Sequence, residues 1–207
     1  MNYNDEYWNN FYSNSKELPL EPSNFAVYVS EFLQTFADKK TYKSILSIGC
    51  GNGRDAYFFS SQGYRVTGID LCAKVETDEF QFLQKNIFDY ELNELNVFDV
   101  CYLRFLIHTL SEQECDQLFA KLALMPPQTL IAFETRSTTN ITKEEKLETF
   151  FSSPIGDEHF RMLYSKHYMD KKISDKFIIL ESSDSSDVAQ FKSENPFCLR
   201  YILHPKR

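Results

Sequence analysis

The most constraining feature of this sequence is a run of three alternating glycines directly after a short apolar segment. Residues 44–48 have the composition of a buried strand, and Gly49, Gly51 and Gly53 follow it. Glycines at this spacing let the chain turn sharply into a helix and let a ligand approach the backbone closely. The next predicted strand ends in Asp70, whose carboxylate can accept both hydroxyls of a ribose. These features predict a site for a nucleoside-type cofactor.

Apolar segments alternate with amphipathic ones along the chain, which is typical of an α/β protein. We predict one domain over residues 1–207, with a helical lid segment over 1–40 and a Rossmann-like core over 41–207. The core is a three-layer fold around a mostly parallel seven-stranded sheet, in which a closing hairpin makes the last strand antiparallel. The expected helices are 4–12, 23–37, 54–61, 111–124 and 157–172, and the expected strands are 44–48, 65–69, 80–85, 98–103, 129–134, 177–180 and 198–203.

The composition excludes several classes of protein. The chain has 207 residues and a formal net charge of −8, which argues against nucleic acid or an anionic membrane as a partner. Its five cysteines form no CxxC pair and indicate reduced thiols, and no cluster has the spacing of metal ligands. Because the chain has neither an apolar run of membrane-spanning length nor a basic leader, we expect a cytoplasmic protein without membrane insertion.

The glycine spacing distinguishes between two cofactors. Dinucleotides use GxGxxG, whereas this loop reads GxGxG and no glycine follows Gly53 until Gly63. The segment GCGNGRDAYFFSSQGYRVTGIDL (49–71) resembles motifs I and II of class I S-adenosylmethionine-dependent methyltransferases. This resemblance implies S-adenosyl-L-methionine as cofactor and S-adenosyl-L-homocysteine as product. Further segments resemble a bacterial small-molecule subgroup that acts on precursors of capsule and other surface polysaccharides, namely 7–12, 22–26, 98–100, 104–108, 133–136, 157–161 and 195–200.

The resemblance also implies roles for individual cofactor-binding residues. The three glycines would bring backbone against the methionine and ribose, Asp70 would hold the ribose, and Leu71 would pack on the adenine. Asn86 and the Ile87 N–H would bond the adenine edge, and residues 101–104 would border the methyl group. The complete expected set is Gly49, Cys50, Gly51, Gly53, Asp55, Asp70, Leu71, Asn86, Ile87 and Leu103.

Two departures from the family pattern concern the cofactor site. Ser47 stands where the family usually has an acid that positions the cofactor's ammonium group, so Asp55 or a nearby carbonyl is the candidate for that task. In addition, only residues 71–79 separate Asp70 from the third strand. The usual helix there is expected to be very short or absent, which leaves one side of the adenine site to solvent or to the N-terminal segment.

Polar and aromatic residues elsewhere predict an acceptor site beside the cofactor. The ligand crevice of an open parallel sheet lies at the carboxyl ends of its strands. Arginine binds phosphate or carboxylate through two parallel hydrogen bonds, so several arginines favour a small anionic acceptor with a phosphate- or phosphoramidate-type group. The expected acceptor residues are Arg104, Glu134, Arg136, His159 and Arg161, with Tyr7, Trp8 and Tyr12 as an aromatic lid.

The expected chemistry is an in-line displacement at a sulfonium methyl group, for which the enzyme mainly positions the reactants. A neutral sugar hydroxyl would need a base, and His108 and His159 are the candidates. An anionic oxygen needs only to be held, and Arg104 would border the methyl group. His108, His159 and Arg104 are therefore the expected catalytic residues.

Several of these residues also have a structural interpretation. Arg104 and Arg136 could form ion pairs with Glu134 or Asp99, and Arg200 could form an ion pair on a face of the sheet. Trp8 could simply pack in the core, and His108 could be a structural histidine. His159 and Arg161 could be exposed on the helix predicted over 157–172, and His167 and His204 are expected at the surface.

Three other function classes stay open at this point. A nucleic-acid or protein methyltransferase is disfavoured by the negative charge and by residues 102–105 (Tyr-Leu-Arg-Phe), which lack the (Asn/Asp)-Pro-Pro-aromatic motif of base-methylating enzymes. A nicotinamide oxidoreductase shares the layered architecture but is disfavoured by the glycine spacing. A non-catalytic cofactor-binding module is kept open by Ser47. The oligomeric state is not predicted.

Overall fold

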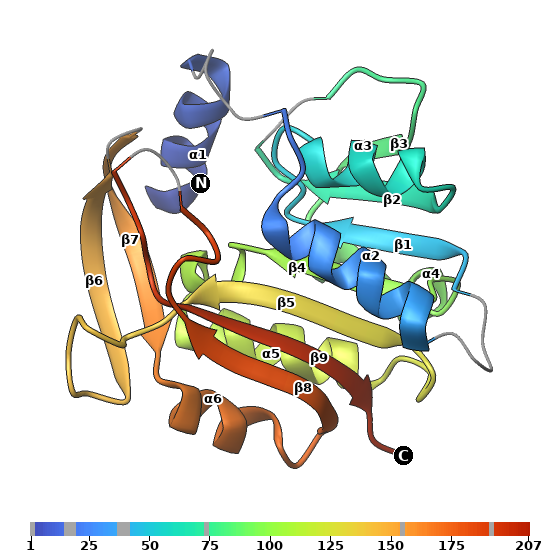
Figure 1. Cartoon of the computed structure of the whole chain (residues 1–207). Coiled ribbons are helices and arrows are strands. Elements are labelled where there is room, and N and C mark those ends of the chain that lie inside the picture. The colour runs from blue at the N-terminus through green and yellow to red at the C-terminus, as the bar shows by residue number, and fades with distance from the viewer. Residues whose placement is uncertain (1–2, 15–19, 37–41, 73–74, 154–155, 191–192) are drawn as a thin grey trace.

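A sheet of seven strands forms the centre of the molecule (Figure 1). The computed structural model describes residues 3–14, 20–36, 42–72, 75–153, 156–190 and 193–207. The strand order is β3-β2-β1-β4-β5-β9-β8; β1 to β5 run parallel, and β9 runs antiparallel to both of its neighbours. The predicted fold is thus confirmed. The strands are β1 (Ser44–Ile48), β2 (Arg65–Asp70), β3 (Gln81–Gln84), β4 (Val100–Arg104), β5 (Leu130–Arg136), β8 (Phe177–Ser185) and β9 (Cys198–Pro205).

Helices cover both faces of this sheet, which gives the three layers seen in Figure 1. α2 (Asn24–Phe36) and α3 (Arg54–Ser61) share one apolar core with the sheet, and α5 (Glu112–Ala123) and α6 (Lys166–Ile173) share the other. Strands buried on both faces explain the nearly continuous apolar runs in the sequence. The shorter elements are α1 (Tyr3–Asn14), η1 (Ile87–Asp89), α4 (Leu92–Leu95) and η2 (Ile107–Thr109).

The start of α5 shows why its sequence forms a helix at this point. The Ser111 hydroxyl accepts a hydrogen bond from Glu114 N, and the Glu114 carboxylate accepts one from Ser111 N at 2.8 Å. This reciprocal capping box satisfies two backbone donors that have no partner inside the helix. The helix ends before Pro126 and Pro127, which cannot continue it. Both boundaries agree with the prediction.

The helix predicted over 157–172 is wrong in its first half. β6 (Lys146–Ser153) and β7 (Gly156–Tyr164) form a separate antiparallel pair, and a helix begins only with α6. His159 and Arg161 occupy alternate positions of β7 and are both buried. Because these polar side chains do not mark a solvent face, the two-residue period of the strand is hidden in the sequence.

The β6–β7 hairpin stands at the carboxyl end of the central sheet. Its second strand forms a bridge from Tyr164 to Ser137, just beyond the end of β5. Figure 1 shows α1 standing beside this hairpin, above the strand ends. The N-terminal helix and the hairpin therefore both border the edge at which an open α/β sheet binds ligands.

No helix among the described residues is long and apolar enough to cross a membrane.

Phe133 offers a test of the core. Its ring is fully buried on β5, stacks on Tyr201 at 4.8 Å and lies 5.6 Å from the ring of Phe119. We expect Phe133→Ala to lower the free energy of unfolding by about 3–5 kcal/mol, because it removes buried contacts and leaves a cavity. Phe150→Ala is the control, since that ring is 52% exposed on β6. Equal shifts of the denaturant midpoint in both variants would contradict the packing described.

Candidate active site

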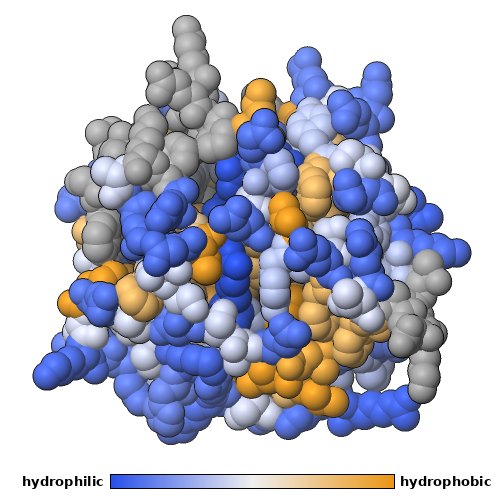
Figure 2. Space-filling model, viewed as in Figure 1, coloured by the Kyte–Doolittle hydropathy of each residue, from blue (hydrophilic) through white to orange (hydrophobic). Residues whose placement is uncertain are grey.

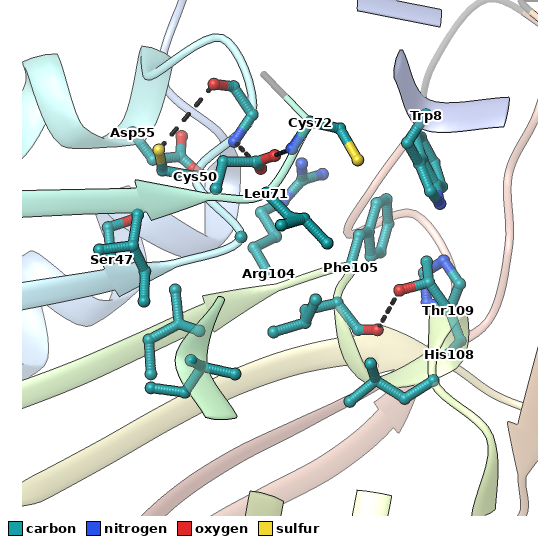
Figure 3. A pocket seen from close by; sticks show the side chains of 18 of the residues that line it. Trp8, Ser47, Cys50, Asp55, Leu71, Cys72, Arg104, Phe105, His108 and Thr109 are labelled. Carbon is teal, nitrogen blue, oxygen red and sulfur yellow. Dashed lines mark hydrogen bonds between the residues drawn. The ribbon is translucent and has the colours of Figure 1, made fainter. Parts of the chain in front are cut away.

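A single cavity of about 350 Å³ joins the glycine loop to the predicted acceptor residues. Figure 3 shows Cys50 and Asp55 on one side, Leu71 and Arg104 near the centre, and Trp8, Phe105 and His108 on the other side. From the glycine loop to the arginines, its wall includes Gly49, Cys50, Gly51, Asp55, Asp70, Leu71, Asn86, Ile87, Arg104, His108, Arg136, Arg161, Trp8 and Tyr12. The expected residues that lie outside the wall are Gly53, Leu103, Tyr7, Glu134 and His159.

The glycine loop adopts backbone angles that favour glycine. Gly51 has φ 56° and Gly53 has φ 81°, both in the left-handed region. A Cβ on Gly51 would lie 2.7 Å from the Tyr12 hydroxyl, and a Cβ on Gly53 would lie 2.8 Å from the Phe80 ring. A side chain at either position would therefore be strained by its backbone angle and would have to displace the neighbouring Tyr12 or Phe80 ring.

Asp70 is held at the wall of the cavity by two backbone groups. Its Oδ2 accepts a hydrogen bond from Gly51 N and its Oδ1 one from Cys72 N, each at 2.9 Å. The carboxylate is 9% exposed. Its position is thus coupled to the glycine loop, and its charge lies at the end of β2 as the sequence predicts.

The part of the cavity predicted to bind adenine has apolar walls, and hydrogen bonds from Asn86 and Lys121 hold the segment behind it in place. Leu71 is 41% exposed toward the cavity, and Ile87 is buried in its wall. The Asn86 side chain accepts a hydrogen bond from Phe88 N at 3.1 Å and so caps η1. Lys121, which the sequence analysis missed, donates to the carbonyl oxygens of Ile87, Phe88 and Tyr90 and holds η1 against α5.

Asp55 joins three distant segments in the cavity wall. Its carboxylate accepts hydrogen bonds from the Ser23 backbone N–H at 2.7 Å, the Ser23 hydroxyl at 2.8 Å and the Tyr102 hydroxyl at 2.8 Å. Burial, followed by the negative charge of Asp55, holds the pKa of Tyr102 well above its usual value, so Tyr102 stays a donor. Ser47 is buried on β1 in the same wall. The ammonium-binding role expected for Asp55 stays a prediction beside this structural one.

Leu103 is a correction to the expected cavity residues. Its side chain packs in the core on the α5 side of the sheet, because successive side chains of a strand point to opposite faces. Arg104 and the residues after β4, Phe105 and Leu106, line the cavity instead. Phe105 has φ 57°, an unusual angle for a residue with a side chain, and its N–H donates to Glu134 O.

Glu134 forms a buried ion-pair network. Arg104 Nε lies 2.9 Å from Glu134 Oε1, and Arg200 Nε lies 2.7 Å from Oε2. The Glu134 side chain has no exposed surface. Arg200 thus makes the ion pair on a face of the sheet that the sequence analysis considered for it. Arg104 forms an ion pair and also lines the cavity.

His108 lies between β5 and the cavity. Its Nδ1 lies 3.2 Å from the Thr135 hydroxyl and accepts a hydrogen bond from the Arg136 backbone N–H at 3.4 Å. Burial, followed by the positive charges of Arg161 and Arg136, holds the pKa of His108 well below its usual value. The ring is therefore neutral at physiological pH.

His159 orients Arg161 from the β6–β7 hairpin. Arg161 Nε donates to His159 Nε2 at 2.9 Å, and both side chains are buried, which contradicts the exposed positions considered above. The Tyr7 ring stacks on the imidazole at 4.2 Å, and Trp8 meets it edge-on at 5.5 Å. Burial and the neighbouring Arg136 lower the pKa of Arg161 to about 10.

Aromatic residues of α1 lie at the cavity, and their predicted role as a lid stays a prediction. Trp8, Tyr12 and the unpredicted Phe11 line the cavity. Burial, followed by the charge of Asp70, holds the pKa of Tyr12 well above its usual value, so its hydroxyl beside Gly51 stays protonated. The lid therefore contacts the predicted cofactor site directly.

Two further charged residues were missed by the sequence analysis. Arg54, the first residue of α3, lines the cavity beside Asp55. Glu194, from the segment between β8 and β9, pairs with Arg136 in the cavity wall. Arg54 follows the last glycine of the loop directly, which was an available signal. Glu194 lies in a polar stretch with no motif to mark it.

No group of three or more His, Cys, Asp or Glu side chains close enough to hold a metal ion is found in the part of the chain that the structure describes.

Comparison with known proteins identifies the class of protein that this fold and site define. A family model described as a methyltransferase domain matches residues 23–171. The chain belongs to the methyltransferase domain family.

Individual relatives agree with this family. A Geobacillus sp. (strain WCH70) protein, GWCH70_2453, provisionally named a methyltransferase, is 32% identical over 156 residues, which are 64% of this chain and 60% of that protein. The match thus spans less than two thirds of the relative's length. A SAM-dependent methyltransferase from Anabaena variabilis ATCC 29413 has a similar structure, with TM-score 0.68 and 14% identity over 100% of this chain and 96% of its own.

The 1,6-didemethyltoxoflavin-N1-methyltransferase of Burkholderia thailandensis was crystallised with bound 1,6-didemethyltoxoflavin and S-adenosylhomocysteine. It is similar at TM-score 0.65 and 14% identity, over 88% of this chain and 79% of that one. At this identity the likeness to both solved structures is a likeness of fold.

Replacing Glu134 tests the ion-pair network. Glu134→Ala removes the buried carboxylate that pairs with Arg104 and Arg200 and leaves both guanidinium groups without it. We expect this change to lower the free energy of unfolding by about 3–5 kcal/mol. Glu148→Ala, which removes an exposed carboxylate on β6, is the matched control. Thermal and denaturant unfolding measure both variants. A Glu134→Ala protein as stable as the control would rule out the structural role.

Proposed function

We propose that this protein transfers the methyl group of S-adenosyl-L-methionine to an anionic oxygen of a small acceptor. Family membership supports the reaction class, and the solved relatives with bound S-adenosylhomocysteine support the cofactor. The observation that carries the proposal is the continuity of one cavity, which joins Gly51 and Asp70 to the three guanidinium groups of Arg104, Arg136 and Arg161.

The residues at the glycine end have the donor and acceptor chemistry that an adenosyl sulfonium needs. Asp70 offers a fixed carboxylate for ribose hydroxyls, and Leu71 and Ile87 offer apolar walls for the adenine. Gly51 and Gly53 keep side chains away from the loop. When bound, the cofactor supplies a methyl group on a positively charged sulfur. The negative charges of Asp70 and Asp55 near it favour that charge.

The methyl transfer itself needs little from the protein beyond orientation. The carbon–sulfur bond breaks while the carbon–oxygen bond forms, and the electron pair of the first bond stays on sulfur as S-adenosyl-L-homocysteine. Holding the acceptor in line and excluding water can lower the barrier by about 7–11 kcal/mol. Arg104 is the candidate to hold the acceptor beside the methyl group, and Trp8 and Tyr12 cover the site on the α1 side.

The charges at the other end favour an anion. Arg161 is buried in the cavity wall near the guanidinium group of Arg136, and burial followed by that positive charge lowers its pKa, although Glu194 acts in the opposite direction. An acceptor anion would be attracted to both guanidinium groups and could bind one of them through two oxygens. This favours an anionic oxygen over a neutral sugar hydroxyl.

The narrower assignment to phosphate- or phosphoramidate-bearing precursors of bacterial surface polysaccharide rests on sequence resemblance and stays a prediction, as does a cytoplasmic location. The family match weighs against the nicotinamide oxidoreductase considered above.

A methyl-transfer assay separates an enzyme from a non-catalytic cofactor-binding module. An acceptor screen with methyl-labelled cofactor tests the charge preference, comparing each sugar phosphate with the same sugar lacking phosphate. Transfer of the labelled methyl group to the sugar without phosphate, and not to the sugar phosphate, would refute the proposal.

Gly51→Ala tests the cofactor end. The added methyl group meets the Tyr12 hydroxyl and needs a backbone angle that alanine rarely adopts. We expect S-adenosyl-L-homocysteine to bind at least about tenfold more weakly, or about 1.4 kcal/mol, by calorimetry. Gly63→Ala is the matched control, because Gly63 has a similar positive φ with nothing within 4 Å of the added carbon. Equal affinities in the two variants would argue against this loop as the cofactor site.

Arg161→Gln tests the acceptor end. We expect kcat/KM for an anionic acceptor to fall at least about tenfold, because a charge-assisted hydrogen bond is lost, while S-adenosyl-L-homocysteine affinity stays unchanged. Arg65→Gln, at the exposed start of β2, is the control. A parallel loss of cofactor affinity in Arg161→Gln would make this arginine structural rather than acceptor-binding.

A further inference from the structure

We infer that His108 binds the acceptor as a neutral hydrogen-bond donor through Nε2–H and does not act as a general base. This inference rests on the proposed anionic acceptor and names a residue that recognises it. It differs from the base role expected from the sequence.

The position of the proton on His108 follows from its contact with β5. The backbone N–H of Arg136 points at His108 Nδ1 at 3.4 Å. A backbone N–H can only donate, so Nδ1 must carry a lone pair in this arrangement. The Thr135 hydroxyl, 3.2 Å from the same nitrogen, can rotate and donate as well. A neutral imidazole with an unprotonated Nδ1 carries its proton on Nε2.

Nε2 is the ring nitrogen left for a ligand, because Nδ1 is engaged with Thr135 and Arg136 of β5. His108 is part of the cavity wall, and no protein group within the described ranges forms a hydrogen bond with its Nε2. Figure 3 shows the imidazole at the end of the cavity that also holds Phe105 and Trp8. A ligand oxygen in the cavity could accept a hydrogen bond from this N–H.

The same end of the cavity is cationic. The Phe105 ring meets His108 edge-on at 5.3 Å and lies 4.2 Å from the Arg104 guanidinium carbon and 5.7 Å from that of Arg136. Donors on the imidazole and on the guanidinium groups therefore surround one space. Such a set binds an oxygen anion, and the carboxylate of Glu194 in the same wall is already paired with Arg136.

Charges from every packed element keep His108 neutral. Arg161 acts on it from β7, Arg136 from β5 and Arg104 from β4, and all three lower its pKa in addition to burial. Glu114 of α5 also lines the cavity, but its carboxylate is engaged in the capping box with Ser111. A second cation there would repel the arginines, whereas a neutral N–H adds a donor without adding charge.

His159 does not provide the missing base. Its Nε2 accepts the Arg161 Nε–H at 2.9 Å, so protonation at Nε2 would break the bond that orients the guanidinium. The two histidines thus have opposite arrangements at Nε2, a donor in His108 and an acceptor in His159. This contrast makes them distinguishable by spectroscopy.

The test is a long-range ¹H–¹⁵N correlation spectrum of the whole protein labelled on its four histidines. The His108 signals are assigned by their loss in His108→Gln or, should that variant not fold, by elimination with His159→Gln, His167→Gln and His204→Gln. The exposed His167 is the internal control for an imidazole that lies outside the cavity. Spectra are recorded between about pH 5 and 8, with S-adenosyl-L-homocysteine and with inorganic phosphate as the anion probe.

We expect His108 to keep its proton on Nε2 and to be neutral near pH 7, because burial and the positive charges of Arg161 and Arg136 lower its pKa. Phosphate should shift the Nε2–H signal, with an affinity at least about tenfold lower in Arg161→Gln. A proton on Nδ1, a His108 that titrates near neutral pH, or an Nε2–H signal that does not respond to bound phosphate would overturn the inference while leaving methyl transfer intact. If calorimetry finds no phosphate binding at all, the anionic acceptor is refuted, and this role of His108 with it.

Discussion

The hydrogen bond from Gly51 N to Asp70 is the contact on which the arrangement of the site depends. It fixes the loop after β1 against the acid at the end of β2, and these are neighbouring parallel strands. The same glycine leaves room for the Tyr12 hydroxyl, so the lid reaches the loop at the point where the carboxylate is held. A side chain at this position would displace either the loop or the lid, because both depend on the same small volume.

A second contact set determines how the N-terminal part of the chain meets this loop. Ser23 directly precedes α2, and its hydroxyl and N–H both donate to Asp55, which also accepts a hydrogen bond from Tyr102 of β4. The carboxylate therefore ties α2, α3 and the centre of the sheet together beside the cavity. Such a buried polar network specifies one arrangement only when its members are satisfied, as they are here. The segment that carries the lid thus leads into an anchored helix.

Local sequence predicted the parts of the site that depend on local structure. The glycine loop, Asp70 and Leu71 were predictable because turn chemistry and strand ends are encoded within a few residues. The position of His159 and Arg161 was not, because their burial depends on α1 and on a hairpin whose polar strand resembles a helix in sequence. The pairing of Glu194 with Arg136 was also beyond prediction, since it joins segments that only the tertiary fold brings together.

The strained backbone of Phe105 shows what the ion-pair network contributes. A non-glycine residue at φ 57° costs about 1–3 kcal/mol and persists only where its surroundings determine it. Its N–H is held by the carbonyl of Glu134, and the Glu134 side chain is held in turn by Arg104 and Arg200. The result is a ring placed against the guanidinium of Arg104 and the edge of His108. Because a relaxed backbone would turn this ring elsewhere, the buried charges of the sheet maintain the shape of the acceptor end as well as its stability.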